Sequence, residues 1–162
     1  MRKFEMVSDK QIKIDFGEEY DYGSRELFID RFQPRRATKY SAAYDLYAPF
    51  SLTLKPGEIA KIPVGFKIKM PRNEGFFIYS RSSYSLKDVV IPAGVNIIDA
   101  DHYNNPDNEG DFFIVIKNNG KEKFNIVQGD RIAQGVFQKY HKVKGEKVTA
   151  KRAGGFGSSG TK

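Results

Sequence analysis

The clearest pattern in the chain is an alternation of apolar and polar residues between positions 61 and 70. In "KIPVGFKIKM" every second residue is apolar, which predicts an extended strand with one buried face made of Ile62, Val64, Phe66, Ile68 and Met70. "QIKIDF" (11–16) repeats this alternation more weakly and predicts a second strand. "FFIYS" (76–80) and "DFFIVIKN" (111–118) are short apolar runs, typical of strands that are buried on both faces.

Turn residues separate these runs. Pro56-Gly57, the stretch from Pro71 to Gly75, and Asn119-Gly120 stand between them, and the Asn-Gly pair favours a tight hairpin. No stretch keeps helical spacing beyond a turn or two. Short strands at close intervals predict an all-β fold, a jelly-roll-like β-barrel. We expect an N-terminal extension with the first strands (1–36), the barrel (37–150) and a flexible glycine-rich arm (151–162).

Composition narrows the class of protein. The chain has 162 residues, 40 % of them hydrophobic and 14 % aromatic, which suits one folded domain. It has no cysteine, so disulfides and thiolate metal sites are excluded. It lacks a run of about 18 apolar residues and begins without a secretory apolar region, so we expect a soluble cytoplasmic protein without a membrane partner.

Charge is distributed unevenly along the chain. Residues 1–30 carry five basic and eight acidic side chains, a net charge of −3, whereas residues 139–162 carry seven basic and one acidic, a net charge of +6. A basic C-terminal arm suits a phosphate-bearing partner, either a nucleotide or a nucleic acid. A solvated tail explains the charge alone equally well.

One segment places two carboxylates where an apolar strand ends. In "IIDADHY" (97–103), a period of two puts Asp99 and Asp101 on the same face. Such a pair can supply a general base or bind a hydrated metal, although Asp is also common in ordinary turns.

Three further segments carry polar groups that suit phosphate. "YSRSSYSLK" (79–87) offers a guanidinium followed by hydroxyls, and "GDRIAQ" (129–134) ends in the Gln134 amide. In "AAYDLYAP" (42–49), Asp45 lies among apolar neighbours and needs partners. Taken singly, each segment is explained as well by a polar loop, a surface strand or a structural hydrogen bond.

Taken in order, the segments carry a family resemblance. "AAYDLYA", "SRSS", "IIDAD", "GDRIAQ" and "RAGGFGSSG" resemble the five ordered motifs of the trimeric deoxyuridine triphosphatase family, from about residue 37 to residue 161. The resemblance implies Mg²⁺-dependent hydrolysis of dUTP to dUMP and pyrophosphate. It also implies a β-barrel homotrimer whose three active sites each combine motifs from all three subunits.

The resemblance also implies roles for residues. Asp99 would activate the water that attacks the α-phosphorus in line. Arg81 and Ser82 would meet the α- and β-phosphates, and Gln134 would help fix the phosphate chain. Mg²⁺ would be held by phosphates and water, with no direct protein ligand and with Asp45 nearby.

By the same resemblance, the tail closes over bound nucleotide. Arg152 would reach the γ-phosphate and Phe156 would cover the uracil. The glycines, Gly157 among them, would let backbone N–H groups approach the phosphates, and Ser158 would add a hydroxyl donor.

Several positions depart from the family pattern. Ser83 replaces a glycine, so its side chain is expected to contact the substrate beside the phosphates. Ala93 replaces an asparagine that often reads the base, and Asn96 replaces a common glycine. The residues expected to read uracil, chiefly through their backbone and with a ring beneath the pocket, are Ala93, Asn96, Ile97, Ile98, Asp99 and Phe113. The tyrosine that packs on the deoxyribose falls at His102, with Tyr103 next to it, and we favour Tyr103 because "NNPDNEG" resembles an insertion that shifts the register.

Other functions are weighed against this one. Deamination of dCTP, a related activity of the fold, needs a glutamate that "DFFIVIKN" lacks. The acidic N-terminal segment suits a regulatory protein partner. No stable nucleic-acid partner is expected, because no aromatic and basic stacking surface is apparent outside the motifs.

Overall fold

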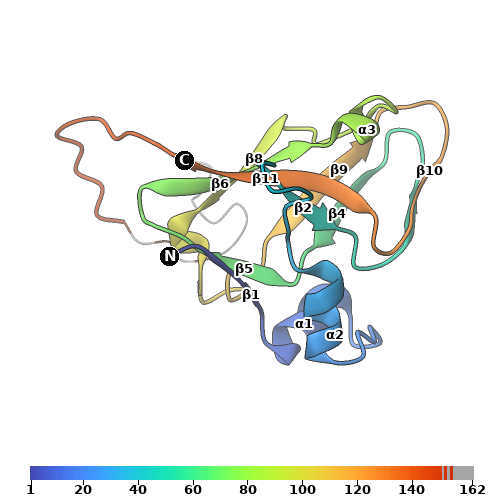
Figure 1. Cartoon of the computed structure of the whole chain (residues 1–162), viewed down its shortest axis with the longest axis horizontal. Coiled ribbons are helices and arrows are strands. Elements are labelled where there is room, and N and C mark those ends of the chain that lie inside the picture. Colours follow the sequence, from blue (N-terminus) through green and yellow to red (C-terminus); the bar gives the residue numbers. More distant parts are fainter. Residues whose placement is uncertain (151, 153, 155–162) are drawn as a thin grey trace.

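The computed structural model describes residues 1–150, 152 and 154, and its strands form four small antiparallel sheets (Figure 1). The largest has the order β2-β11-β6-β8 and consists of Tyr44–Tyr47, Arg131–Lys139, Glu74–Ser80 and Val95–Asp99. The second, β4-β9-β7, consists of Ile59–Pro63, Phe113–Asn118 and Val89–Val90. The two-stranded sheets are β1-β5 (Lys3–Met6, Phe66–Lys69) and β10-β3 (Phe124–Ile126, Leu52–Leu54). The predicted all-β, jelly-roll-like class is confirmed, with the strands divided among separate sheets.

The sheets enclose one aromatic and aliphatic core. Its largest fully buried side chains include Phe28, Phe66, Phe76 and Phe112. A Cβ on Gly135 of β11 would lie 2.1 Å from the Phe76 ring, so only glycine lets that ring lie across the strand. The core thereby fixes β6 against β11, the two central strands of the largest sheet.

The alternating stretch 61–70 is buried as predicted but forms two strands. Val64 and Gly65 separate β4 from β5, and Gly65 has φ of 77°, a left-handed conformation that ends the strand. Its missing side chain also admits the Phe28 ring, which would lie 2.8 Å from an added Cβ. The chain therefore turns into a new sheet while its apolar side chains stay in the core.

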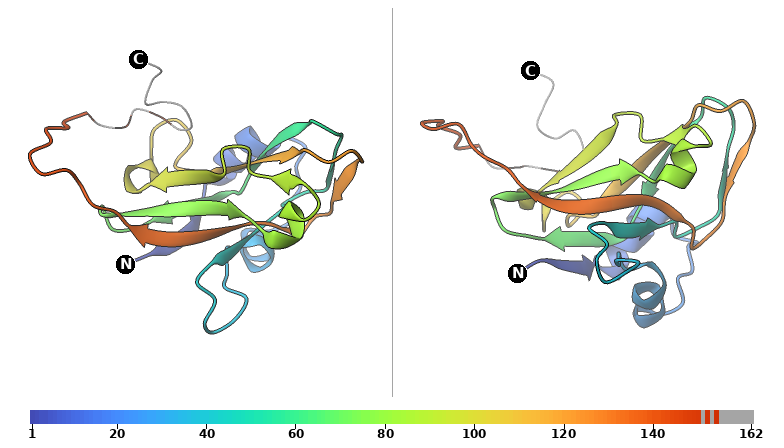
Figure 2. Two further views of the ribbon diagram at one scale, coloured as in Figure 1. Left: turned by 90° about the horizontal axis from the view of Figure 1, so that it is seen from above. Right: turned by 45° about the horizontal axis from the view of Figure 1, so that its top comes forward.

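The strand predicted for 11–16 is wrong, because these residues belong to helix α1 (Asp9–Phe16). Ser8 caps the helix by accepting a hydrogen bond from the Gln11 backbone N–H, and Asp9 occupies its first turn. Ile12 is buried and Ile14 is 62 % exposed, so the alternation did not mark a buried face. A second helix, α2 (Arg25–Phe32), packs beside it under β1 and β5 (Figures 1 and 2).

The hairpin predicted at Asn119-Gly120 is also wrong. The turn exists, but β9 pairs with β4 and β7, while β10 pairs with β3. The buried Asn118 amide donates to the Leu54 and Glu122 carbonyls, and the Asn119 N–H donates to the Asp88 carbonyl. These bonds hold the turn against other strands, so the two flanking strands separate.

Two short helical turns follow strands of the largest sheet. Helix α3 (Ser82–Ser85) follows β6, and the 3₁₀ turn η1 (Ala100–His102) follows β8. After β11, residues 140–150 run away from the sheets as an exposed segment (Figures 1 and 2). In the described part of the chain, no helix is long and apolar enough to cross a membrane.

Candidate active site

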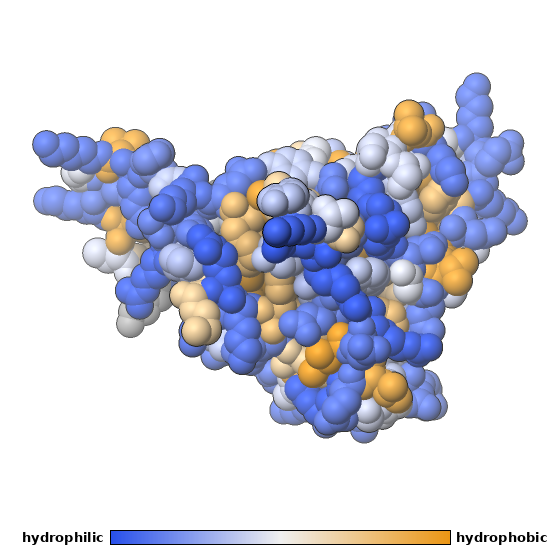
Figure 3. Space-filling model, in the orientation of Figure 1, coloured by the Kyte–Doolittle hydropathy of each residue, from blue (hydrophilic) through white to orange (hydrophobic). Residues whose placement is uncertain are grey.

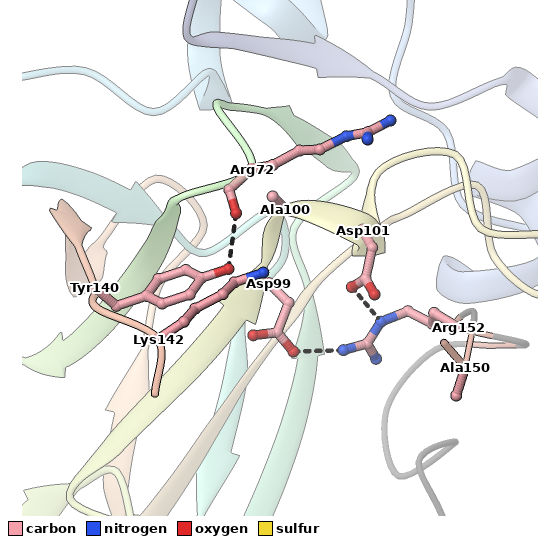
Figure 4. Close-up of a pocket in the computed structure, with 8 residues that line it drawn as sticks. All are labelled: Arg72, Asp99, Ala100, Asp101, Tyr140, Lys142, Ala150 and Arg152. Atoms are coloured by element: carbon pink, nitrogen blue, oxygen red, sulfur yellow. Dashed lines mark hydrogen bonds and ion pairs between the residues drawn. The ribbon is translucent and has the colours of Figure 1, made fainter. Parts of the chain in front are cut away.

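The carboxylates Asp99 and Asp101 lie at the end of β8. Asp99 is the last strand residue and Asp101 lies in η1, so the predicted extended strand does not reach Asp101. The turn nevertheless brings both side chains to one guanidinium: Arg152 donates to Asp99 Oδ2 at 2.5 Å and to Asp101 Oδ1 at 2.8 Å (Figure 4). The Asp99 and Asp101 side chains are 56 % and 62 % exposed, so water reaches both.

A cavity of about 620 Å³ opens over this pair. It is lined by residues from the β5–β6 turn, from the end of β8 and η1, and from the segment after β11: Arg72, Asp99, Ala100, Asp101, Tyr140, Lys142, Ala150 and Arg152 (Figure 4). Three cationic side chains therefore accompany two carboxylates. This arrangement suits an anionic ligand whose reacting atom meets a carboxylate-bound water.

The two rings considered for the sugar contact lie elsewhere. His102 is 4 % exposed, its Nε2 is 3.0 Å from the Asp111 carbonyl oxygen, and burial lowers its pKa. Tyr103 donates its hydroxyl to Glu5 at 2.5 Å, and this hydrogen bond raises the Tyr103 pKa. Neither ring lines the Asp99 cavity, and the deoxyribose contact stays a prediction for both.

The strand predicted to read the base alternates in burial. Asn96 and Ile98 point into the core, whereas Ile97 is 51 % exposed beside Asp99 and Ala93 lies in the exposed turn before the strand. Asn96 Nδ2 is buried without a hydrogen-bond partner among the described atoms. Because the Asn96 and Ile98 side chains are buried, only the backbone of these two residues is available to a ligand.

Phe113 lies outside the Asp99 cavity. It begins β9 opposite Pro63, and the Lys61 ammonium lies 3.9 Å from its ring centroid. Its predicted place beneath the base stays a prediction. Phe156, Gly157 and Ser158 lie outside the described residues.

A second polar cluster forms where β6 ends. Asp45, only 7 % exposed, places Oδ1 3.4 Å from Arg81 Nε and Oδ2 3.3 Å from Arg131. Arg81 also donates to the Arg131 carbonyl at 3.0 Å. Asp45 thus has the partners that its apolar surroundings required, and it holds two guanidinium groups in place.

Gln134 completes this cluster from the strand next to Asp45. The two residues are paired in the β2–β11 register, and the Gln134 amide donates to the Ser80 carbonyl at 3.2 Å. Ser82 and Ser83 are exposed in α3, directly after Arg81. A cavity of about 370 Å³ opens beside Asp45, Arg81, Arg131 and Gln134.

The two clusters occupy opposite ends of the same sheet. Asp99 pairs with Gly75 at the start of β6, whereas Arg81 follows Ser80 at its end. Gly75 and Arg81 are six residues apart along an extended strand, so the clusters lie about 20 Å apart. Within one chain, Arg81, Ser82 and Gln134 therefore do not meet Asp99, the predicted general base, whereas Arg152 contacts it.

Several residues of these clusters were not predicted as site residues. Arg131 lies inside "GDRIAQ", and its spacing of three from Gln134 was the available signal. Arg72, Tyr140 and Lys142 lie in no motif, and only the strand register brings them to Asp99.

Comparison with known proteins gives a consistent result. The family model described as dUTPase matches residues 32–160. A deoxyuridine 5'-triphosphate nucleotidohydrolase of Lactococcus lactis is 42 % identical over 130 residues, covering 78 % of this chain and 87 % of that protein.

Solved structures resemble the fold. A crystal structure of dUTPase from Streptococcus mutans matches with a TM-score of 0.72 and 31 % identity, covering 88 % of this chain and 98 % of the other. The dUTPase of Staphylococcus bacteriophage 80alpha matches with a TM-score of 0.65 over 93 % of this chain and 97 % of the other, and its 20 % identity supports the fold alone.

Proposed function

This chain belongs to the dUTPase family, whose members hydrolyse dUTP to dUMP, and from that premise we propose that Asp99 activates the attacking water. The observation that carries this proposal is the exposed Asp99 carboxylate at the end of β8, inside a cavity lined by cations. A carboxylate placed there accepts the proton of a water as that water attacks the α-phosphorus in line. General-base catalysis of this kind contributes about 10²–10⁴-fold in rate.

Arg152 contacts the proposed catalytic carboxylate directly. Its guanidinium bridges Asp99 and Asp101. A guanidinium hydrogen-bonded to Asp99 Oδ2 occupies an oxygen that a water would otherwise use as its acceptor. We propose that the γ-phosphate draws Arg152 away, which leaves the Asp99 oxygen to the attacking water. The following residues, with Phe156 over the uracil and Gly157 and Ser158 at the phosphates, then close the site.

The cluster at the other end of the sheet binds the phosphate chain. Arg81 offers a guanidinium already held by Asp45, so little side-chain freedom is lost when phosphate binds. Ser82 adds an exposed hydroxyl, and Ser83 projects into solvent. Gln134 lies beside Arg81 and fixes the chain through its amide.

The donor set fits a Mg²⁺ ion that enters on the phosphates. Both Asp45 oxygens face guanidinium groups, and among residues 1–150, 152 and 154 no three His, Asp or Glu side chains gather as ligands. Asp45 would accept hydrogen bonds from the waters around the ion. When bound, the ion neutralises phosphate charge and favours departure of pyrophosphate.

A homotrimer brings the two clusters together. Because Asp99 and Arg81 of one chain lie about 20 Å apart, a single active site needs Asp99 from one subunit and Arg81 from another. This sharing agrees with the trimeric assembly implied by the motifs. Light scattering on dilute protein should give the mass of three chains, and a fully active monomer would contradict the shared site.

Substrate selectivity tests the proposed activity. Pyrophosphate release should be much faster from dUTP than from dTTP, dCTP or UTP, and chelation of Mg²⁺ should abolish it. The purified Asp99→Asn protein serves as the control for contaminating phosphatases. Equal turnover of dTTP would overturn the base selectivity, because a backbone-read uracil pocket leaves no room for the 5-methyl group.

A regulatory protein partner is the second candidate, and one surface favours it. Residues 1–31 precede the region matched by the family model, and they include two exposed apolar side chains, Ile14 of α1 and Leu27 of α2. Figure 3 shows hydrophobic atoms gathered over these helices. Asp99→Asn separates the candidates, because a partner bound through α1 and α2 would stay bound while turnover is lost.

A further inference from the structure

We propose that Arg72 and Lys142 form a second polyphosphate-binding edge beside Asp99, supplied by the same subunit that supplies the carboxylate. The proposal deepens the assigned dUTP hydrolysis and rests on it. Neither residue belongs to the sequence motifs that carry the family resemblance.

The strand register holds both residues at one end of the sheet. Gly75 pairs with Asp99 on one side and with Gln138 on the other, so β8, β6 and β11 are aligned there. Arg72 lies three residues before Gly75, and Lys142 lies four residues after Gln138. Their positions next to Asp99 therefore follow from the backbone of the sheet.

Tyr140 fixes the two segments to each other. Its hydroxyl donates to the Arg72 carbonyl oxygen at 2.7 Å, and its backbone N–H donates to the Asn73 carbonyl at 3.2 Å (Figure 4). Both bonds involve main-chain acceptors, so the Arg72 side chain takes no part in them. The Arg72 guanidinium is therefore available to a ligand. Replacing the Arg72 side chain leaves both hydrogen bonds of Tyr140 intact.

Two of the three cationic side chains that line the cavity form no ion pair within the described residues. Arg152 occupies one oxygen each of Asp99 and Asp101. Among the ion pairs of the described residues, none includes Arg72 or Lys142. In Figure 4 the Lys142 side chain runs toward Asp99, while the Arg72 side chain extends past Ala100 and above Asp101, away from Asp99.

A polyphosphate is the ligand that suits this pair. A guanidinium matches two phosphate oxygens at once, and an ammonium supplies a compact charge to a third. The nucleotide triphosphate is strongly anionic, so the edge both attracts it and holds it near Asp99. Binding of this type lowers KM and depends on ionic strength, while the chemical step is left to Asp99.

The test compares two double variants with the same change in charge. Arg72→Ala/Lys142→Ala removes the edge, and Lys144→Ala/Lys147→Ala removes two exposed cations from the same C-terminal segment that do not line the cavity. We expect the first to raise KM for dUTP roughly tenfold or more at low salt, with kcat within about twofold of wild type, and the second to change neither. An Arg72→Lys protein, which keeps the charge, should have a KM for dUTP between those of wild type and the Arg72→Ala/Lys142→Ala protein.

Binding of pyrophosphate gives a readout that does not need turnover. Calorimetric titration should show weaker binding to Arg72→Ala/Lys142→Ala than to wild type and to the Lys144→Ala/Lys147→Ala control, with unchanged melting temperatures. Equal binding to all three proteins, or a fall in kcat at constant KM, would overturn the proposal. If wild type binds pyrophosphate through Arg72 and Lys142 but does not hydrolyse dUTP, the proposed activity is wrong and the proposed binding site is supported.

Discussion

At one end of the largest sheet, Asp45 is almost buried and lies between Arg81 and Arg131; at the other, Asp99 and Asp101 are more than half exposed and share Arg152. At the first end, Asp45 and Arg131 lie in β2 and β11, and Arg81 directly follows β6; these three strands are paired side by side. At the second end, the cation that bridges the two carboxylates comes from beyond residue 150. One end is therefore built by the sheet, and the other depends on a segment that leaves it.

This difference matches two kinds of chemistry. Phosphate binding gains from donors that are already in place, because ordering them then costs less free energy when the ligand binds. Water activation needs an open carboxylate and a cation that can exchange partners when nucleotide arrives. The same sheet provides the rigid half and the open half, at ends too far apart to serve one nucleotide within a chain.

The largest expected effect is at the open end. Asp99→Asn keeps the shape of the side chain and removes the proton acceptor, so kcat should fall about 10²–10⁴-fold while dUTP still binds. Single-turnover kinetics together with equilibrium binding of dUMP provide the measurement. A kcat within a few-fold of wild type would mean that another group activates the water.

A smaller effect is expected at the rigid end. Arg81→Gln removes a charged donor to phosphate, so kcat/KM should fall roughly 10- to 100-fold, the range of a charge-assisted hydrogen bond. Arg131→Gln should cost less, because Arg131 is the more exposed of the two arginines bound to Asp45. Steady-state kinetics on both variants give the loss of kcat/KM for each. A larger loss for Arg131→Gln than for Arg81→Gln would make Arg131 the principal phosphate ligand.

The smallest effect on catalysis is expected beneath the open end, at Asp111. This carboxyl is fully buried, and burial, followed by the nearby Asp15 carboxyl, raises its pKa well above 3.8. The pKa of Asp111 is higher in the folded than in the unfolded protein. The protonated carboxyl therefore contributes its full stabilisation below about pH 3.8, and this stabilisation is lost as the pH rises through the folded-state pKa. Other groups that face it are the Gly65 and Phe112 backbone N–H groups, which favour the charged form.

Asp111→Asn removes this titration. The melting temperature of wild type relative to this variant should therefore fall as pH rises, while kcat/KM for dUTP stays within about twofold because Asp111 lies outside the Asp99 cavity. Asp30→Asn, an exposed change of equal charge, is the control and should show no such trend. A pH-independent difference would mean that Asp111 is not titrating in the folded protein.

The sequence motifs nominated residues at both ends of the sheet but did not predict how far apart they lie. Asp99, Arg81, Gln134 and Asp45 were proposed from local motifs. Asp99 ends β8 and Arg81 follows β6, whereas Asp45 and Gln134 lie within β2 and β11. The distance between these residues depends on which strands pair. The pairing of β8 with β6 and of β6 with β11 cannot be predicted from short stretches of sequence. Arg72 and Lys142 were missed for the same reason.

The errors in the fold have local physical causes. The alternation of Ile12, Ile14 and Phe16 favoured a strand, but the Ser8 cap and two turns of helix prevailed, leaving Ile14 exposed. At 61–70 the burial was predicted correctly, yet Gly65 divided the strand because its positive φ also makes room for Phe28. The contact between Phe28 and Gly65 joins α2 to the sheet. The two residues are far apart in the sequence, so no local pattern predicts it.

Mixed oligomers test most directly whether the two ends act together across subunits. Asp99→Asn and Arg81→Gln proteins, each expected to be at least about tenfold less active than wild type, are unfolded and refolded together in equal amounts, with each refolded alone as the control. If a site takes Asp99 from one chain and Arg81 from its neighbour, random trimers should recover about a quarter of wild-type activity, because one site in four then has both native residues. If both residues of a site come from one chain, every site carries one substitution, and activity no higher than the average of the two separate proteins would contradict the shared site.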